Sequence, residues 1–401
     1  MTNIDVARVR QAADRLAGTI GVTPIEASAG LSEISGQDVW LKCENLQVTG
    51  SFKVRGAFFR ISELSAEQQQ AGVVAASAGN HAQGVALSAA QLGIPATIFM
   101  PQDAALPKII ATESYGAKVE LVPGNVGAAL EAAQEFAART GAQVIHPYNH
   151  PDVIAGQGTL ALEIVEQLPE VKTIIVPIGG GGLAAGIAAA LAEERPHIKV
   201  VGVQAEAAAS YPSSLAAGEP VTVTVNPTMA DGIAVPRAGD VPFEIIARTG
   251  VEVLTVTEEQ LSQAVLFAAE RAKLVVEPAA AATVAALMAY PGRFAGPIVA
   301  LLSGGNIDPL VLMRVIRHGL AATGRFWQFR LRLPDRPGVL AGLASVLGDN
   351  GANVMHIAHV RTALDLGLDE VEVDLQLETK GLEHCQRLAA LLTQRGYRVV
   401  G

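Results

Sequence analysis

Cysteine is almost absent from this chain. Cys43 and Cys385 are the two cysteines among 401 residues, and they lie far apart in the sequence. So small a number excludes the disulfide framework on which small secreted proteins depend. A reducing compartment is the simpler interpretation, and we expect a cytoplasmic protein.

An excess of basic residues is also missing. The formal net charge is -10 and the sequence pI is about 5.4. No strongly basic run interrupts this acidic balance. Nucleic acids and anionic membrane surfaces attract basic proteins, so neither is expected as a partner.

Signal and membrane segments are not expected either. The N-terminal stretch 1–19 carries several charges, lacks the apolar centre of a signal peptide and is predicted to be a helix. Residues 174–192 contain no charge and are long enough to span a membrane. Pro177 and four consecutive glycines argue against a lipid-exposed helix there, whereas a strand, a glycine loop and a buried helix fit the same residues.

Several common catalytic motifs are missing as well. The sequence has no Cys/His metal-ligand spacing, no G-x-S-x-G and no G-x-x-x-x-G-K-[ST]. The usual signatures of metallohydrolases, serine hydrolases and P-loop enzymes are therefore absent, and none of these classes is expected. Glu206 is a candidate cation ligand, but the residues after it supply no second carboxylate, so no metal site is expected.

What the chain does contain is a long alternation of short apolar runs and helical segments, between about residues 70 and 320. Its length is sufficient for two or three domains. The alternation predicts a mainly parallel sheet with helices on both faces, where ligands bind at loops that follow the carboxyl ends of strands. The strand-like runs are GVVAAS, ATIFMP, KVELVPG, TIIVPI, KVVGVQAE and PIVALLSGG.

The pattern changes after about Thr323. Every second side chain from Trp327 to Leu333 is apolar and the residues between them are polar, which is typical of a half-buried antiparallel strand. The same alternation returns over residues 371–377, with helical and further strand-like segments between and after. The order β-α-β-β-α-β predicts a ferredoxin-like module over residues 326–401.

Four consecutive glycines follow one predicted strand and precede a predicted helix. Glycine amides at a helix N-terminus can surround a phosphate without side-chain obstruction, aided by the helix dipole. Two alternatives remain open: a structural turn, and an NAD site that uses a relaxed dinucleotide fingerprint together with Glu206. The four residues are Gly179, Gly180, Gly181 and Gly182, and the fingerprint is Gly180, Gly182 and Ala185.

Three further glycine loops are predicted after strands. The loop from Ser77 to His81 offers a hydroxyl, backbone amides and an amide side chain, which suit a carboxylate or a phenolic oxygen, although a helix cap fits equally well. Ser303, in Ser-Gly-Gly-Asn, can bond the nitrogen of a heterocycle. The segment Gly156–Thr159 is better explained as a helix cap than as a catalytic or binding loop.

Lys53 stands in Thr-Gly-Ser-Phe-Lys-Val-Arg-Gly, between an aromatic residue and a valine. A surface lysine whose stem covers apolar neighbours is the ordinary interpretation. A buried lysine would have a lowered pKa and a nucleophilic amine. A lysine, a phosphate loop and a neutral hydroxyl donor together are what pyridoxal phosphate requires of a protein.

At these motifs the sequence resembles the pyridoxal-phosphate enzymes of the tryptophan synthase β fold, and among them the threonine deaminases that carry one ACT domain. The resemblance covers roughly residues 10–322, and its motifs occur in the order of the family. They are ENLQVTGSFKVRGA, SAGNHAQGVA, VIAGQGT, PIGGGGLAAGI and LLSGGNID.

The resemblance implies a role for each motif at the cofactor. Lys53 holds pyridoxal 5'-phosphate as an imine and then acts as the catalytic base, and Phe52 packs against the cofactor ring. Asn80 bonds the 3-hydroxyl and Ser303 meets the pyridine nitrogen. The phosphate is bound by Gly179, Gly180, Gly181 and Gly182. The loop that contains Ser77, Asn80 and His81 grips the substrate carboxylate.

The implied fold is α/β, with a two-lobed catalytic domain of mainly parallel sheets over residues 1–322. A smaller lobe, about residues 45–150, is inserted in the larger one. Residues 326–401 are implied to be a regulatory ACT domain of βαββαβ order, with Gly338 and Asn353 as candidate effector-binding residues. We expect a homodimer or homotetramer.

The implied reaction converts L-threonine to 2-oxobutyrate and ammonia, and L-serine to pyruvate, under the control of an amino-acid effector. Serine racemases that this chain resembles carry the motif SSGNH, and its second serine acts as a base on the opposite face of the substrate. This chain has Ala78 at that position. Dehydration is therefore favoured over racemisation. The alternatives are a serine racemase or serine dehydratase, an NAD-binding oxidoreductase and a non-catalytic amino-acid sensor.

Overall fold

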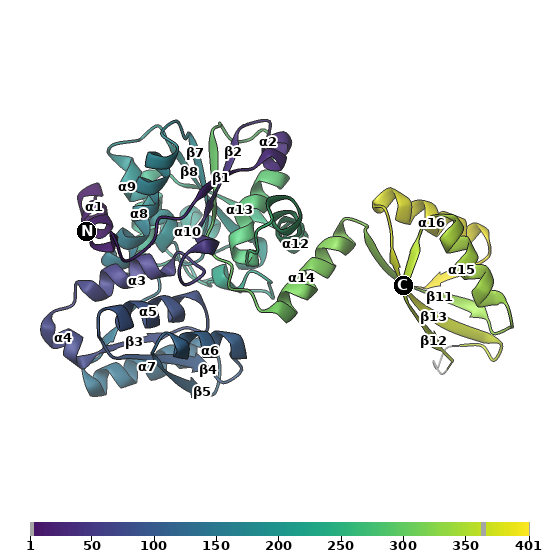
Figure 1. Cartoon of the computed structure of the whole chain (residues 1–401), viewed down its shortest axis with the longest axis horizontal. Coiled ribbons are helices and arrows are strands. Elements are labelled where there is room, and N and C mark those ends of the chain that lie inside the picture. Colours follow the sequence, from purple (N-terminus) through teal and green to yellow (C-terminus); the bar gives the residue numbers. More distant parts are fainter. Residues whose placement is uncertain (1–3, 362–365, 401) are drawn as a thin grey trace. The chain divides into compact units, whose positions relative to one another are not determined.

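The computed structural model describes residues 4–361 and 366–400, and the chain divides into two compact units (Figure 1). The first unit is Met1–Leu312 and the second is Met313–Gly401. The division falls inside helix α14 (Pro309–Ala322). Each unit has its own apolar core.

The larger sheet of the first unit has six strands in the order β1-β2-β10-β7-β8-β9. β1 runs antiparallel to β2, and the other neighbouring pairs are parallel. β7 and β10 are buried along their whole length, as expected for apolar runs in a sheet covered on both faces. The strands are β1 (Ile25–Ala27), β2 (Val39–Cys43), β7 (Thr173–Pro177), β8 (Lys199–Ala205), β9 (Glu252–Val256) and β10 (Ile298–Leu302).

Helices cover both faces of this sheet. α9 and α13 both pack on β7 and β8, and they lie on opposite sides of the sheet in Figure 1. α1 and α8 pack against α9. The helices of this lobe are α1 (Val6–Leu16), α2 (Ala29–Ser35), α8 (Pro151–Gln167), α9 (Gly182–Ala192), α10 (Ser210–Ala217), α11 (Asp240–Thr249), α12 (Glu258–Phe267) and α13 (Pro278–Ala289).

The prediction of a loop or helix cap at Gly156–Thr159 is wrong, because this segment lies inside α8. A Cβ atom on Gly156 would lie 2.6 Å from Cα of Gly56, and one on Gly158 would lie 2.7 Å from the carbonyl oxygen of Gly186. These glycines allow α8 to approach α3 (Lys53–Ser62) and α9 closely. Helix packing, and not turn geometry, explains the glycines here.

The smaller lobe contains a parallel sheet in the order β5-β4-β3-β6. All four strands lie between residues 73 and 144, so the chain enters this lobe after β2 and returns to the larger sheet at β7. Alternate residues of the strands contribute to two apolar clusters, one on the α5 side and one on the α7 side. The elements are α4 (Ala66–Ala71), β3 (Val73–Ala76), α5 (Asn80–Gln91), β4 (Ala96–Pro101), α6 (Leu106–Ser114), β5 (Lys118–Val122), α7 (Val126–Thr140) and β6 (Gln143–Val144).

The second unit has the predicted βαββαβ order. Its sheet is antiparallel with the strand order β12-β13-β11-β14. The alternation read from the sequence is confirmed, because Phe329, Leu331 and Leu333 are buried and face the cluster that α15 and α16 complete. The elements are β11 (Phe326–Pro334), α15 (Val339–Asp349), β12 (Asn353–Val360), β13 (Glu370–Glu378), α16 (Leu382–Gln394) and β14 (Arg398–Val400).

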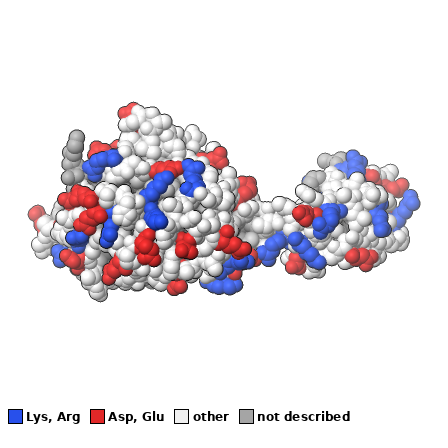
Figure 2. Space-filling view, turned by 90° about the horizontal axis from the view of Figure 1, so that it is seen from above, with Lys and Arg blue, Asp and Glu red and all other residues white. Residues whose placement is uncertain are grey.

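Residues 174–192 form a strand, a glycine loop and a buried helix, as predicted. Among residues 4–361 and 366–400, no helix is both long enough and apolar enough to cross a bilayer. On the face drawn in Figure 2, acidic and basic side chains are intermixed over the surface of each unit.

Candidate active site

Lys53 is the first residue of α3, and two contacts fix the chain just before it. Ser51 pairs with Gly304 in an isolated β-bridge. The backbone N–H of Phe52 donates to the carbonyl oxygen of Ser303 over 3.1 Å. The start of α3 therefore lies beside the loop that follows β10, although the two segments are far apart in the sequence.

Lys53 is half-buried, and its amine lies near a backbone carbonyl and an aromatic ring. Its Nζ atom donates to the carbonyl oxygen of Pro147 over 3.1 Å and lies 5.1 Å from the centre of the Phe52 ring. Burial lowers the pKa of Lys53 to about 8, although the carboxylate of Glu277 acts in the opposite direction. A lowered pKa leaves more of the amine unprotonated near neutral pH, as a nucleophile or base requires.

Two neighbouring histidines are held in the neutral form. Burial, and next the charge of Lys53, lower the pKa of His81 to about 3 and that of His146 to about 4. Nε2 of His81 lies 2.7 Å from the carbonyl oxygen of Ile145, so this nitrogen carries the proton. The predicted substrate-loop residue His81 is thus bound to backbone in this structure and is 4% exposed.

The other residues predicted in that loop lie at the start of α5. Ser77 is half-buried, and its Oγ accepts from the backbone N–H of Gly79 over 3.2 Å. Asn80 begins the helix, and its Nδ2 donates to Oε1 of Glu277 over 2.7 Å. Its Oδ1 accepts from Nδ2 of Asn306 over 2.9 Å. Asn80 therefore connects the smaller lobe with the loops around β10 and α13.

The four-glycine loop ends β7 and begins α9. Gly181 adopts φ 98°, in the left-handed region that favours glycine, and no side chain caps the helix. A Cβ atom on Gly182 would lie 2.9 Å from Cβ of Tyr148, and one on Gly180 would collide with the Tyr148 ring. Tyr148 follows Pro147, whose carbonyl binds Lys53, so the glycine loop and the lysine meet at the same short segment.

Ser303 is the third predicted contact. It follows β10 and is 3% exposed, and its carbonyl holds Phe52 as described. The structure therefore brings together Lys53, Phe52, Asn80 and Ser303 through the α3, α5 and β10 segments. Glu206, which the NAD alternative needs, is exposed at the start of a 3-10 helix, Glu206–Ala208.

Sequence reasoning missed Glu277, which comes from the distant segment before α13. It stands at the N-cap position with Pro278 after it, so its sequence context predicts an ordinary helix start. In the structure its side chain makes no cap hydrogen bond, and the residue is 7% exposed. Burial raises its pKa to about 7. No local signal could have found its contact with Asn80, which is 197 residues away along the chain.

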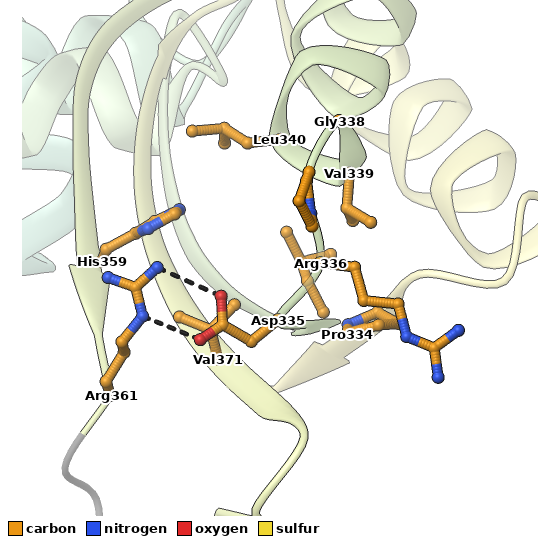
Figure 3. A pocket seen from close by; sticks show the side chains of 11 residues that line it. Pro334, Asp335, Arg336, Gly338, Val339, Leu340, His359, Arg361 and Val371 are labelled. Atoms are coloured by element: carbon orange, nitrogen blue, oxygen red, sulfur yellow. Dashed lines mark hydrogen bonds and ion pairs between the residues drawn. The ribbon is translucent and has the colours of Figure 1, made fainter.

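The second unit has a separate pocket of about 350 Å³ at the turn between β11 and α15 (Figure 3). Gly338, a predicted effector-binding residue, lines it. Asn353 is not among the lining residues, and its Nδ2 donates to Glu378 over 3.2 Å. The lining residues are Leu333, Pro334, Asp335, Arg336, Pro337, Gly338, Val339, Leu340, His359, Arg361 and Val371.

The pocket carries a pair of opposite charges beside an apolar wall. Nε of Arg361 donates to Oδ2 of Asp335 over 2.8 Å, and a second guanidinium nitrogen donates to Oδ1 over 3.1 Å. The hydrogen bonds from Arg361 lower the pKa of Asp335. In the part of the chain that the structure describes, no group of three His, Cys, Asp or Glu side chains is placed to hold a metal ion.

Known proteins resemble the chain in both units. The family described as "Pyridoxal-phosphate dependent enzyme" matches residues 16–304, and the family described as "ACT domain" matches residues 327–383. An L-threonine ammonia-lyase of Thermotoga maritima is 43% identical over 401 residues, which covers 99% of this chain and 100% of that protein.

Two solved structures resemble the larger unit. Maize serine racemase superposes with a TM-score of 0.74 at 34% identity, covering 80% of this chain and 98% of its own. The processed form of threonine deaminase isoform 2 from Solanum lycopersicum also has a TM-score of 0.74 at 34% identity, covering 79% of this chain and 95% of its own.

Proposed function

The chain belongs to the pyridoxal-phosphate-dependent enzymes and carries an ACT domain, and on this premise we propose that it is a regulated threonine ammonia-lyase. It converts L-threonine to 2-oxobutyrate and ammonia, and L-serine to pyruvate. One observation carries this proposal: the 43% identity to an L-threonine ammonia-lyase extends through both domains.

The residues at the site fit pyridoxal phosphate. Lys53 offers an amine whose pKa burial lowers to about 8, as a covalent attachment point requires. The loop Gly179–Gly182 offers backbone amides at an uncapped helix N-terminus, in a place where side chains at Gly180 and Gly182 would collide with Tyr148. In the proposed arrangement Asn80 bonds the 3-hydroxyl, Ser303 meets the ring nitrogen and Phe52 packs on the ring.

When bound, the cofactor supplies an electron sink for negative charge at the substrate α-carbon. Lys53 would supply the base, because its amine, when free and unprotonated, can accept the α-proton. A neutral hydroxyl at Ser303 does not stabilise a protonated ring nitrogen in the way that a carboxylate would. The Ser77–His81 loop is proposed to hold the substrate carboxylate with its amides and the Ser77 hydroxyl, since the His81 ring is bound to Ile145.

Serine racemase is the nearest alternative, since a maize serine racemase has this fold. Racemisation requires a second acid–base group on the opposite face of the α-carbon. Ala78 occupies the position at which the racemase motif SSGNH has its second serine. The methyl group of alanine transfers no proton. The position therefore favours dehydration.

The purified holoenzyme is expected to release 2-oxobutyrate and ammonia from threonine, and pyruvate from serine, with little D-serine. Keto acids are measured by coupled reduction and D-serine by chiral chromatography in the same reaction. Rapid D-serine formation with little pyruvate would contradict the assignment. A protein that holds cofactor but turns over neither amino acid would instead support the non-catalytic sensor.

We further propose that the Asp335–Arg361 pocket binds the amino-acid effector, with isoleucine and valine as the candidates to test. A zwitterionic amino acid carries an ammonium and a carboxylate, which match the Asp335 carboxylate and the Arg361 guanidinium. The apolar wall, which includes Leu340 and Val371, suits a branched aliphatic side chain. Gly338, which lines this pocket, remains a proposed contact, whereas Asn353 does not line it and remains an effector-binding candidate outside the pocket.

Arg361→Gln is expected to raise the effector concentration needed for a half-maximal response by about tenfold or more, because the charge-assisted contact proposed between its guanidinium and the effector carboxylate is lost. Threonine turnover is measured against isoleucine and valine concentration, together with direct binding by calorimetry. Arg387→Gln is the matched control, since Arg387 is exposed on α16 and does not line the pocket. Equal responses of Arg361→Gln and wild type would place the effector elsewhere.

Two further properties are proposed from the same premise. We expect a homodimer or homotetramer, supported by the edge strand β12, whose Met355 and Ile357 are 60% and 40% exposed. We expect a cytoplasmic enzyme, supported by the two cysteines, both of which are free thiols.

A further inference from the structure

A chain of hydrogen bonds fixes the side chain of Asn306 first. Its Nδ2 atom lies 2.6 Å from the carbonyl oxygen of Thr49. A backbone carbonyl can only accept, so this end of the Asn306 amide must be the NH₂ group. The same nitrogen lies 2.9 Å from Asn80, so the atom of Asn80 that faces it must be the oxygen.

Glu277 fixes the other end of the Asn80 amide. Its Oε1 accepts from Nδ2 of Asn80 over 2.7 Å. If the Asn80 amide were reversed, its NH₂ group would face the NH₂ group of Asn306. Its oxygen would then face Oε1 of Glu277, so neither contact would be a hydrogen bond. In the observed orientation, Oδ1 of Asn80 faces Asn306 and one N–H of its Nδ2 atom donates to Glu277. The second N–H of Asn80 is left to donate to a further acceptor.

Glu277 is itself held from several sides. Its backbone N–H donates to the carbonyl oxygen of Gly304 over 3.1 Å, and a Cβ atom on Gly304 would lie 2.5 Å from its Oε1. Burial and the charge of Asp231 raise the pKa of Glu277 to about 7, while Asn80, Lys108 and Lys53 act in the opposite direction. The Glu277 carboxyl group is thus buried at a position that disfavours its ionised form. Its side chain contacts Asn80 instead of capping α13.

We propose that Glu277 is a positioning residue that acts through Asn80. It holds the Asn80 carboxamide so that the remaining N–H is offered as a donor to the ring hydroxyl oxygen of the cofactor. A donor at this oxygen favours its ionised form. The proposal rests on the role of Asn80 in the proposed function.

The test compares wild-type, Glu277→Ala and Glu277→Gln holoenzymes at one pH. Glu277→Ala should bind pyridoxal phosphate roughly tenfold more weakly, and its absorbance should shift toward the form with a neutral ring oxygen, because Asn80 is free to turn. Glu277→Gln should stay within about threefold of wild type in both measurements, since its amide oxygen still accepts from Asn80. Cofactor affinity is measured by equilibrium dialysis.

Two outcomes would overturn the proposal. Glu277→Ala could match wild type in affinity and spectrum, so that Asn80 needs no such partner. Glu277→Gln could match Glu277→Ala, in which case the charge of Glu277 acts and not its hydrogen bond.

Asn306→Ala provides a second route if Glu277→Ala does not fold. Removing Asn306 frees the oxygen end of Asn80, so the same spectral shift is expected, and an unchanged spectrum would contradict the proposal. Asn80→Ala sets the full size of the effect. Wild-type enzyme that binds no cofactor and releases no ammonia from threonine would refute the proposed function itself, independently of Glu277.

Discussion

Lys53→Ala enzyme is expected to lose at least about 10³-fold in kcat/KM for threonine, because one substitution removes both the covalent attachment point and the base. The neighbouring His81 and His146 are poor substitutes, because burial lowers their pKa values to about 3 and about 4 and so makes them weak bases, and His81 is bound to a backbone carbonyl. The visible absorbance that borohydride removes from wild-type enzyme should also be missing. Steady-state assays and absorbance spectra of dialysed protein measure the two losses.

Lys118→Ala is the control for this experiment. Lys118 is an exposed lysine of the same unit, paired with Glu120 on β5, and its loss should leave activity and absorbance unchanged. Thermal unfolding of both variants without cofactor shows whether the fold survives. Lys53→Ala enzyme that retains most of its activity would contradict the site assignment, whatever its spectrum.

Arg55→Ala is expected to lower the free energy of unfolding of the catalytic unit by about 3–5 kcal/mol, because it leaves the buried carboxylate of Glu44 without its ion-pair partner. Arg55 is 1% exposed. Its guanidinium donates to Glu44 over 2.8 Å through two nitrogens and to Glu163 over 2.6 Å. Lys42, also fully buried, donates to the same Glu163 over 2.7 Å.

Urea unfolding measures this change, and the two tryptophans make the measurement specific. Trp40 lies in the first unit and Trp327 in the second, so a Trp327→Phe background lets fluorescence report the catalytic unit. Arg10→Ala is the matched control, since its ion pair with Glu194 is exposed and should contribute less than about 1 kcal/mol. A loss of similar size in both variants would show that the buried network contributes little.

The fold was predictable where most residues of a strand are apolar. The six apolar runs in the first unit correspond to β3, β4, β5, β7, β8 and β10. β2 was not predicted, because the short strand contains Lys42, which has the appearance of a surface residue. Its amine is satisfied by Glu163, Gln167 and the carbonyl oxygen of Thr23, partners that the local sequence does not reveal. β6 spans only two residues, which is too short for any periodicity.

The candidate site was predictable where its residues share a motif with the loop that holds them. Lys53, Asn80, Ser303 and the four glycines lie in such motifs, and the structure places them around α3, α5, β10 and α9. Glu277 and Tyr148 were missed, because each acts through a contact with a distant segment. Gly156 and Gly158 show the converse error, since glycine in a helix interior can serve close packing as well as a turn.

The glycine contacts of α8 have a consequence for how this sequence can change over time. One helix meets α3, which begins with Lys53, and also α9, which begins at the four-glycine loop, and both meetings are backbone against backbone. Backbone atoms are among the nearest neighbours at each of these glycines, and a backbone cannot be shortened in compensation. Gly56, Gly156, Gly158 and Gly186 are therefore expected to vary together or not at all among descendants that keep the enzyme active.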